Sequence, residues 1–364
     1  SPANRYLVVF LATLVLATGL GPVAAAKTKS TAARRPNIVY INADDLGWAD
    51  LSCQGSTYYE TPNLDRLAAQ GMRFTDGYAP AANCAPSRAC VISGQYGPRH
   101  GIYTVGTSER GSAQDRKLIP IKNTTVLADD NVTIAEALQA AGYVTGHVGK
   151  WHLGEDPTTQ GFDVNIAGRE WGSPRGGYHS PYKFPNCEQP EKGEYLTDRL
   201  GHEAAAFIRQ NKDRPFFLHF ATYSVHTPIQ GKQELIQRYQ RKTPSKAHND
   251  PTYAAMIHSL DEAVGRVLDT LDELGLAART LVLFCSDNGG VWHISKQWPL
   301  RAGKGSYYEG GIREPLLVRW PGVIAKGSTC GVPVSGIDFY PTFLEAAGVA
   351  VPAGKILDGV SLMP

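Results

Sequence analysis

The sequence predicts an α/β fold in which a mostly parallel central sheet is sandwiched by helices, and two observations lead to this prediction. Short apolar runs alternate with amphipathic stretches of helical period along most of the 364 residues, which is typical of parallel strands joined by helices. Polar residues also gather directly after four of the apolar runs. Because ligands of parallel α/β sheets bind outside the carboxyl ends of the strands, this second pattern indicates one shared crevice.

Five of the apolar runs have the length and the branched or aromatic composition of buried strands. They comprise residues 37–41, 143–148, 216–222, 280–286 and 316–320. Thr61, followed by proline, begins a helix that ends at Gly71, and the capping box of Thr133 and Glu136 begins another that ends at Gly142. Further helices are expected at residues 195–211, 250–275 and 341–347.

The composition is that of a soluble globular chain without a strong charge bias. The formal net charge is +2, charged residues make up 19% of the chain, and the mean hydropathy is slightly negative. No basic block indicates binding to nucleic acid or to an anionic membrane. The length is sufficient for one large domain, which we place at residues 36–364.

Residues 1–26 predict a secretory signal peptide. Arg5 precedes an apolar run over residues 6–20, and small residues follow before Lys27, as in cleavable signals. An uncleaved membrane anchor is the alternative, but the run is short for a transmembrane helix. Residues 27–35 form a polar, basic linker that we expect to be disordered. The chain is therefore expected to be exported to the periplasm or the extracellular space, with no stable membrane insertion after cleavage.

Cys84 stands out among the six cysteines. It precedes Pro86 and Arg88 in a segment that ends at Gly94, a pattern typical of a helix with proline in its first turn and glycine as its C-cap. Because a helix N-terminus favours negative charge, Cys84 is expected where anions bind. The spacing suits neither a disulfide nor zinc. The alternative interpretation is a buried structural thiol.

Two oxygen-bearing pairs follow separate strands: Asp44 with Asp45, and Asp287 with Asn288. Oxygen donors suit a hard cation, Ca²⁺ in the first place and Mg²⁺ as the second possibility, and disfavour zinc. Taken singly, the first pair could be a turn or a helix cap, and the second could be a tight turn, since Asn-Gly is a turn signal. Their joint occurrence at two strand ends favours a metal site.

Four further side chains at the strand ends could contact the same ligand. Lys150 and His152 alternate around Trp151, so in a strand-like geometry both would face one side. His226 lies in a loop, and Lys304 lies between two glycines, which would leave it exposed and let a ligand approach the backbone closely. Each position is also compatible with an ordinary solvated lysine or a satisfied loop histidine.

Taken in order, these segments resemble the motifs of the formylglycine-dependent sulfatase family, which is arylsulfatase-like and part of the alkaline phosphatase superfamily. The shared motifs are Asp-Asp, Cys-x-Pro-Ser-Arg, Gly-Lys-Trp-His-Leu-Gly, His-x-Pro, Asp-Asn-Gly-Gly and Gly-Lys-Gly. The resemblance covers residues 36–364 and implies a sulfuric ester hydrolase whose Cys84 is oxidised to formylglycine by a maturation enzyme. The metal ligands that it implies are Asp44, Asp45, Cys84, Asp287 and Asn288.

The resemblance also implies a role for each basic side chain. One hydroxyl of the hydrated formylglycine, activated by the metal, attacks sulfur, while Arg88, Lys150 and Lys304 balance the developing charge. His226, together with Lys304, donates to the leaving oxygen. His152 takes the proton from the second hydroxyl, which expels sulfate and regenerates the aldehyde.

A sulfated carbohydrate is the expected substrate, by analogy with the family. Candidate substrate-binding residues lie in loops after the motif segments, where each could equally be an ordinary loop residue. They are Trp171, Arg175, His179, His293 and Arg301. One alternative function is a phosphonate or phosphodiester hydrolase of the same superfamily. Another is a non-enzymatic sulfoglycan-binding protein, which would be expected to have lost a catalytic residue that this chain retains.

The chain ends at Pro364, at a point where members of the family usually continue into a smaller C-terminal subdomain with a short antiparallel sheet. We therefore expect a catalytic domain that stops before this subdomain.

Overall fold

The computed structural model describes residues 35–187 and 191–363. The predicted signal peptide over residues 1–26 and the linker up to residue 34 lie outside the described residues. Within the described part of the chain, no helix is long and apolar enough to cross a membrane.

The described residues form one nine-stranded sheet with the order β4-β3-β5-β1-β6-β7-β2-β8, and β9 also pairs with β2. The strands are β1 (Asn37–Ala43), β2 (Met72–Tyr78), β3 (Val144–Gly149), β4 (Val164–Ile166), β5 (Phe216–Ala221), β6 (Thr280–Ser286), β7 (Arg313–Arg319), β8 (Ser328–Cys330) and β9 (Val334–Ser335). The five strands from β4 to β6 are mutually parallel, whereas β7 is antiparallel to both of its neighbours. The predicted mostly parallel sheet is thereby confirmed.

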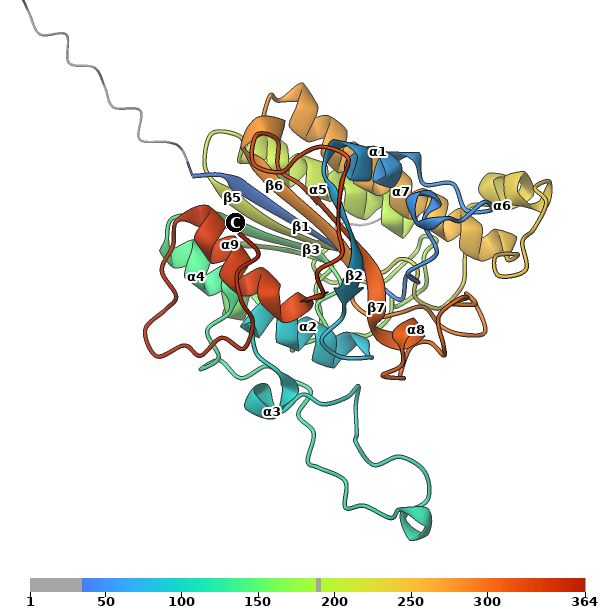
Figure 1. The fold of residues 1–364 in the computed structure, drawn as a ribbon, viewed down its shortest axis with the longest axis horizontal. Helices are drawn as coiled ribbons and strands as arrows, with labels where there is room; N and C mark the ends of the chain where they lie inside the picture. Colours follow the sequence, from blue (N-terminus) through green and yellow to red (C-terminus); the bar gives the residue numbers. More distant parts are fainter. Residues whose placement is uncertain (1–34, 188–190, 364) are drawn as a thin grey trace, which may run out of the picture. The chain divides into compact units, whose positions relative to one another are not determined.

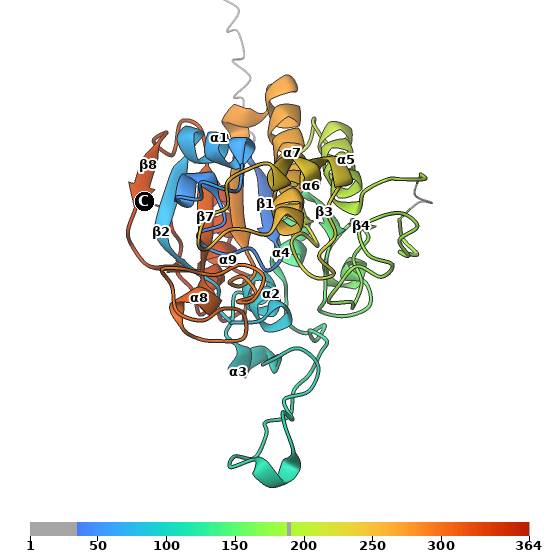
Figure 2. The same ribbon diagram turned by 90° about the vertical axis from the view of Figure 1, so that its right-hand side faces the viewer.

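Helices cover both faces of this sheet (Figures 1 and 2). One face carries α1 (Pro62–Gln70), α5 (Leu196–Gln210) and α7 (Pro251–Glu273), with α6 (Gln233–Gln240) packed on α7. The other carries α2 (Cys84–Ser93), α4 (Ile134–Ala140) and α9 (Phe339–Ala347). Two short helices are α3 (Gly97–His100) and α8 (Glu309–Ile312).

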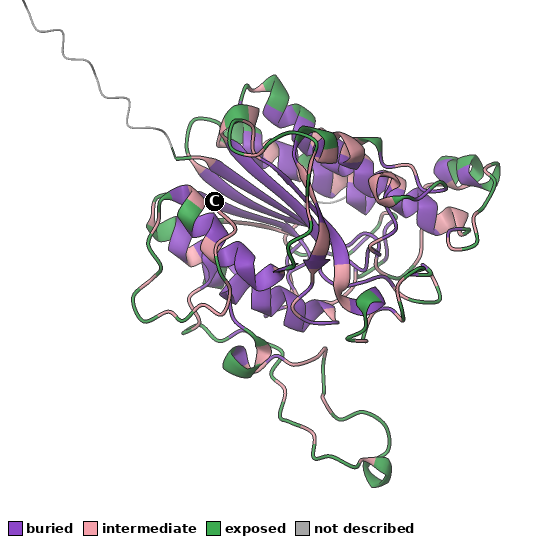
Figure 3. Cartoon of the chain, in the orientation of Figure 1, coloured by how far each residue is buried: buried purple, intermediate pink, exposed green. Residues whose placement is uncertain are grey.

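Alternate residues of β1 show how the two cores are divided. Val39 and Ile41 pack in the core beneath α5 and α7, whereas Ile38 and Tyr40 pack in the core beneath α4 and α9. Every residue of β1, β3, β5 and β6 is buried, as Figure 3 shows for the centre of the sheet. Burial on both faces explains why these strands are continuous apolar runs in the sequence.

The sequence placed most of these elements within a few residues. The helix predicted after Thr61 begins at Pro62 and ends before Gly71, although the Thr61 side chain makes no capping hydrogen bond. The capping box of Thr133 and Glu136 is present. The strand expected at 316–320 begins at Arg313 and ends at Arg319. β2, β4, β8, β9 and α6 were not predicted, because they are short or lack the regular burial that gives a periodic pattern; β2 is mostly half-buried.

Candidate active site

The polar segments after β1, β3, β5 and β6 converge at one edge of the sheet, as the sequence predicts. Backbone hydrogen bonds continue the strand pairing beyond the strands and hold the loops together. The Asp44 amide donates to the Ser224 carbonyl at 2.9 Å, and the Asp287 amide donates to the Ala43 carbonyl at 3.0 Å. Side chains on these loops are consequently fixed by the sheet itself.

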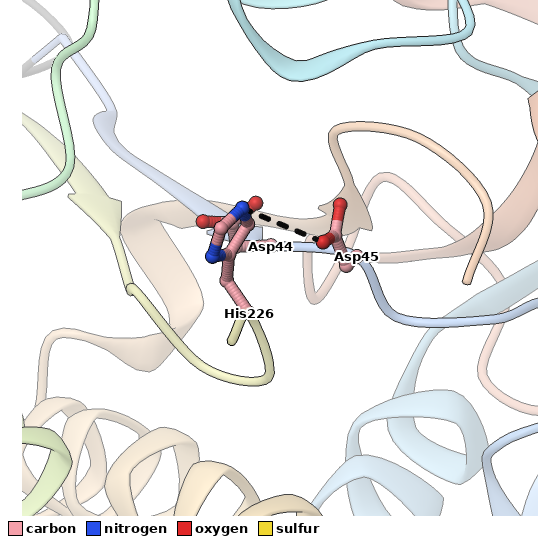
Figure 4. Close-up of side chains that lie close together, drawn as sticks. All are labelled: Asp44, Asp45 and His226. Carbon is pink, nitrogen blue, oxygen red and sulfur yellow. Dashed lines mark ion pairs between the residues drawn. The ribbon is translucent and has the colours of Figure 1, made fainter. Parts of the chain in front are cut away.

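The acidic side chains of this edge lie together and are buried. Asp44, Asp45 and Asp287 are at most 2% exposed, and ligand atoms of Asp44, Asp45 and His226 lie within 4.8 Å of one another (Figure 4). The Asn288 side-chain amide donates to Asp45 Oδ1 at 2.8 Å, while Asp44 Oδ1 and Asn288 Oδ1 are buried without a hydrogen-bond partner. Unsatisfied oxygens in an oxygen-rich set are what a hard cation binds, so these residues fit the predicted metal site.

Each of the three carboxylates is paired with one basic side chain. The ion pairs are Lys150–Asp44 at 2.7 Å, Arg88–Asp287 at 2.8 Å and Lys304–Asp45 at 2.7 Å. Burial raises the pKa of Asp44 to about 6 although Lys150 opposes the shift. Burial also disfavours ionised Asp287, but Arg88 and Lys150 outweigh it and lower the pKa of Asp287 to about 2. The negative charge of the three carboxylates is therefore compensated by the three basic side chains.

Cys84 is the first residue of α2, and Gly94 closes this helix in the left-handed conformation, as predicted. The thiol is 2% exposed and forms no disulfide. Burial raises the pKa of Cys84 even though Lys150 and Lys304 act in the opposite direction. A neutral buried thiol is a poor nucleophile, so the unmodified cysteine is badly suited to attack.

His152 reaches the cluster by a route that the sequence did not predict. Its φ is 66°, so the strand-like alternation expected for residues 150–152 is wrong. The His152 amide donates to the Arg169 carbonyl at 2.9 Å, and a Cβ added to Gly172 would lie 2.7 Å from His152 Cε1. Burial, reinforced by the positive charge of Lys150, lowers the pKa of His152 to about 2. The ring is therefore neutral, and the same burial and positive charge oppose its protonation.

His226 and Lys304 complete the cluster from the side of Asp45. His226 Nδ1 donates to the Thr227 carbonyl at 2.7 Å, and its Nε2 lies 3.7 Å from Asp45 Oδ2. The expectation of an exposed Lys304 is wrong, since its side chain is only 19% exposed and held by Asp45. The side chain is held in a buried position by Asp45, which is distant in the sequence.

The five candidate substrate-binding residues fall in different places. Trp171, with Arg175 stacked 4.3 Å above its ring, adjoins the His152 side of the cluster, and the exposed Arg301 and His293 lie on the loop that carries Lys304. His179 instead lines a cavity of about 720 Å³ with Asp198 and other residues outside the cluster, and Gly231 accepts from its ring. The structure does not bring His179 to the site.

The sequence did not predict a cleft of about 610 Å³ that is lined by His152 and by Ala85, the residue after Cys84. Its walls include Ala85, His152 and Glu155, and the segment around Val105 and Val126 forms another side. The composition of the 105–126 segment does not indicate that it lines a cleft, because the segment contains no motif and only its backbone course brings it there.

The fold and this cluster define a hydrolase of the alkaline phosphatase-like class. Residues 36–349 match the family model described as Sulfatase, and the chain belongs to the sulfatase family, whose members hydrolyse sulfuric esters. The predicted family, fold class and enzyme class are thereby confirmed.

Several known proteins are similar over most of the chain. A sulfatase of Formosa agariphila is 36% identical over 93% of this chain and 73% of its own length. Human arylsulfatase A is 37% identical over 91% of this chain and 68% of its own length. The crystal structure of Ps i-CgsB in complex with k-i-k-neocarrahexaose has a TM-score of 0.79 at 33% identity, covering 91% of this chain and 76% of that one.

Proposed function

We propose that this enzyme hydrolyses sulfate esters of carbohydrates, with Cys84 converted to formylglycine and a divalent cation bound beside it. The observation that carries the proposal is the set of three carboxylates and three basic side chains around Cys84, with two buried oxygens left without partners. Ca²⁺ is the preferred cation and Mg²⁺ the second choice, since the donors are oxygens. The ligands we assign are Asp44, Asp45, Asp287, Asn288 and residue 84.

A carbohydrate substrate is supported by the solved relative that binds a carrageenan oligosaccharide. The proposal also includes export to the periplasm or the extracellular space and a maturation enzyme that oxidises Cys84. When present, the hydrated aldehyde supplies the attacking hydroxyl and the cation supplies Lewis-acid polarisation.

The basic side chains of the cluster would then stabilise the sulfuryl group. Arg88, Lys150 and Lys304 are rigidly held cations, and preorganised charge of this kind is usually the largest contribution to catalysis. His226 Nδ1 donates to the Thr227 carbonyl, so Nε2 can donate to the leaving oxygen, with Lys304 nearby, only when both ring nitrogens carry a proton. His152, whose Nδ1 is buried without a hydrogen-bond partner, would accept the proton released when sulfate departs.

The test compares Cys84→Ala with Cys90→Ala in the same helix. Both thiols are buried, but only the first is placed at the cluster. We expect Cys84→Ala to lower turnover of 4-nitrophenyl sulfate by on the order of 10³-fold or more, with folding retained, and Cys90→Ala to keep it. Undiminished multiple turnover by Cys84→Ala would refute the proposal.

Two measurements separate the finer parts of the proposal. The intact mass of the peptide containing residue 84 shows whether the thiol has become an aldehyde. Rates on 4-nitrophenyl sulfate and bis(4-nitrophenyl) phosphate, measured on the same preparation, distinguish sulfur from phosphorus chemistry. Faster phosphodiester cleavage would favour a phosphonate or phosphodiester hydrolase instead.

A further inference from the structure

Two exposed arginines at the rim of the site are stacked on aromatic rings. Arg175 lies 4.3 Å above the Trp171 ring, and Arg301 lies 3.8 Å above the Tyr308 ring. Within the described residues, neither guanidinium has a carboxylate partner. A stacked guanidinium keeps its planar N–H edge free, and this edge matches the oxygens of a sulfate or a carboxylate.

Other arginines that contact aromatic rings are neutralised. Arg169 lies 5.6 Å from the Trp171 centroid, but Glu155 and Glu170 pair with it at 3.0 Å and 3.2 Å. Arg313 lies over Trp48 and pairs with Asp76 and Glu309. Stacking alone thus does not explain the two unpaired arginines, which carry positive charge that no described carboxylate balances.

Both unpaired arginines are close in the chain to residues of the catalytic cluster. Gly172, next to Trp171, packs directly against the His152 ring. Arg301 precedes Lys304 by three residues, and the Gly310 amide anchors the Arg301 carbonyl at 2.9 Å. The exposed aromatic ring of Trp292 borders the same loop, because its backbone packs against Gly303.

The segments that carry the two arginines lie on different sides of the cluster. The segment with Arg175 follows β4, and the segment with Arg301 follows β6. Four strand spacings separate β4 from β6 in the sheet order, which corresponds to roughly 19 Å. The ends of β3, β5 and β1, which carry much of the cluster, lie between them.

We infer that Arg175 on Trp171 and Arg301 on Tyr308 bind two further anionic groups of the substrate, one on each side of the scissile sulfate. The substrate class is then an oligosaccharide sulfated at several positions and extending across the site in both directions. A small monosulfate reaches only the buried cluster and cannot span both arginines. This inference rests on the proposed sulfatase function and adds the charge pattern of the substrate.

The experiment measures binding in a Cys84→Ala background, so that neither maturation nor turnover affects the result. Titration calorimetry compares 4-nitrophenyl sulfate with multiply sulfated hexasaccharides of carrageenan, heparin and chondroitin sulfate. Arg175→Gln, Arg301→Gln and the double variant are compared with Arg214→Gln. Arg214 is also exposed, but it directly precedes β5 and therefore lies at the amino ends of the parallel strands, away from the cluster at their carboxyl ends.

We expect at least one hexasaccharide to bind more tightly than the monosulfate. Each rim substitution should weaken that hexasaccharide about tenfold and the double variant about a hundredfold, as loss of one and of two charge-assisted contacts predicts. Arg214→Gln should have no effect. The inference is wrong if no hexasaccharide binds more tightly than the monosulfate, or if the rim variants weaken binding no more than Arg214→Gln.

A second preparation, with residue 84 intact, keeps this result separate from the proposed function. If mature protein with an intact residue 84 turns over 4-nitrophenyl sulfate but the rim variants bind the hexasaccharide as tightly as before, the inference is wrong and the proposed function stands. Absence of any sulfate ester turnover by protein with a verified aldehyde would overturn the proposed function.

Discussion

Replacing Arg88 with methionine should destabilise the fold by about 3–5 kcal/mol, because it leaves a buried carboxylate without its partner. The Arg88 and Asp287 side chains are 1% and 0% exposed and lie 2.8 Å apart. Arg88 Nε also donates to Asp287 at 2.9 Å, and Nη1 donates to the Lys150 carbonyl at 2.9 Å. At roughly 2 °C per kcal/mol for a chain of this size, the melting temperature should fall by roughly 6–10 °C.

The assay is urea unfolding in EDTA, so that no divalent cation compensates the carboxylate. Two variants make the measurement specific. Arg88→Met combined with Asp287→Asn removes both charges and should recover much of the lost stability without recovering activity. Arg99→Met breaks the half-exposed pair with Asp358 and should cost less than about 1 kcal/mol.

Arg88 does not compensate the buried charge of Asp287 if Arg88→Met costs less than about 1 kcal/mol, or if the double variant is as unstable as the single one. Either result would mean that water or a neighbouring lysine replaces the guanidinium.

Two further predictions concern a glycine beside His152 and the buried His100. Gly172→Ala should lower kcat by about tenfold or more with little loss of stability, because its Cβ would lie 2.7 Å from His152 Cε1 and a small misplacement of a catalytic group is costly. The control is Gly97→Ala, whose Cβ would have its nearest neighbour 3.5 Å away. Equal kcat values for the two variants would contradict the prediction. The unfolding free energy should fall as the pH drops from about 6.5 to about 4, since burial lowers the pKa of His100 to about 4 and the unfolded chain then binds a proton that the fold rejects, at a cost of up to about 3 kcal/mol. The unfolding free energy, measured by urea unfolding at several pH values, should depend less steeply on pH in His100→Gln than in the unmodified protein. Equal pH dependence of the two proteins would show that His100 is not the group responsible.

Features that depend on neighbouring residues in the sequence could be predicted, whereas features that depend on distant residues could not. The strands at 37–41 and 280–286 could be predicted because both faces of each are buried, which leaves an uninterrupted apolar run. The carboxylates that follow them could be placed together because parallel strands end at one edge. The capping box at Thr133 is local, and it was predicted correctly.

Features that depend on distant partners were not predicted. Lys304 reads as exposed between glycines, but a carboxylate 259 residues away holds it. His152 lies in a left-handed turn that its own sequence does not reveal, since the Arg169 carbonyl and Gly172 shape its surroundings. His179 shares the loop character of Arg175 but is drawn to another cavity by packing on Tyr195.

The ion pairs of the cluster link its stability to its chemistry. Asp44, Asp45 and Asp287 carry three negative charges, and Arg88, Lys150 and Lys304 carry three positive charges, so the described cluster is formally neutral. This balance allows so many charges to be buried within one fold.

A divalent cation held by these residues would change the balance to a net charge of +2 and would compete for the oxygens of Asp44 and Asp45 that the two lysines now contact. The lysines would then be available to the sulfuryl oxygens. Substrate affinity should therefore depend on the cation even when residue 84 is alanine. Calorimetry of 4-nitrophenyl sulfate with and without Ca²⁺ measures this dependence, and equal affinities would show that the lysines do not exchange partners.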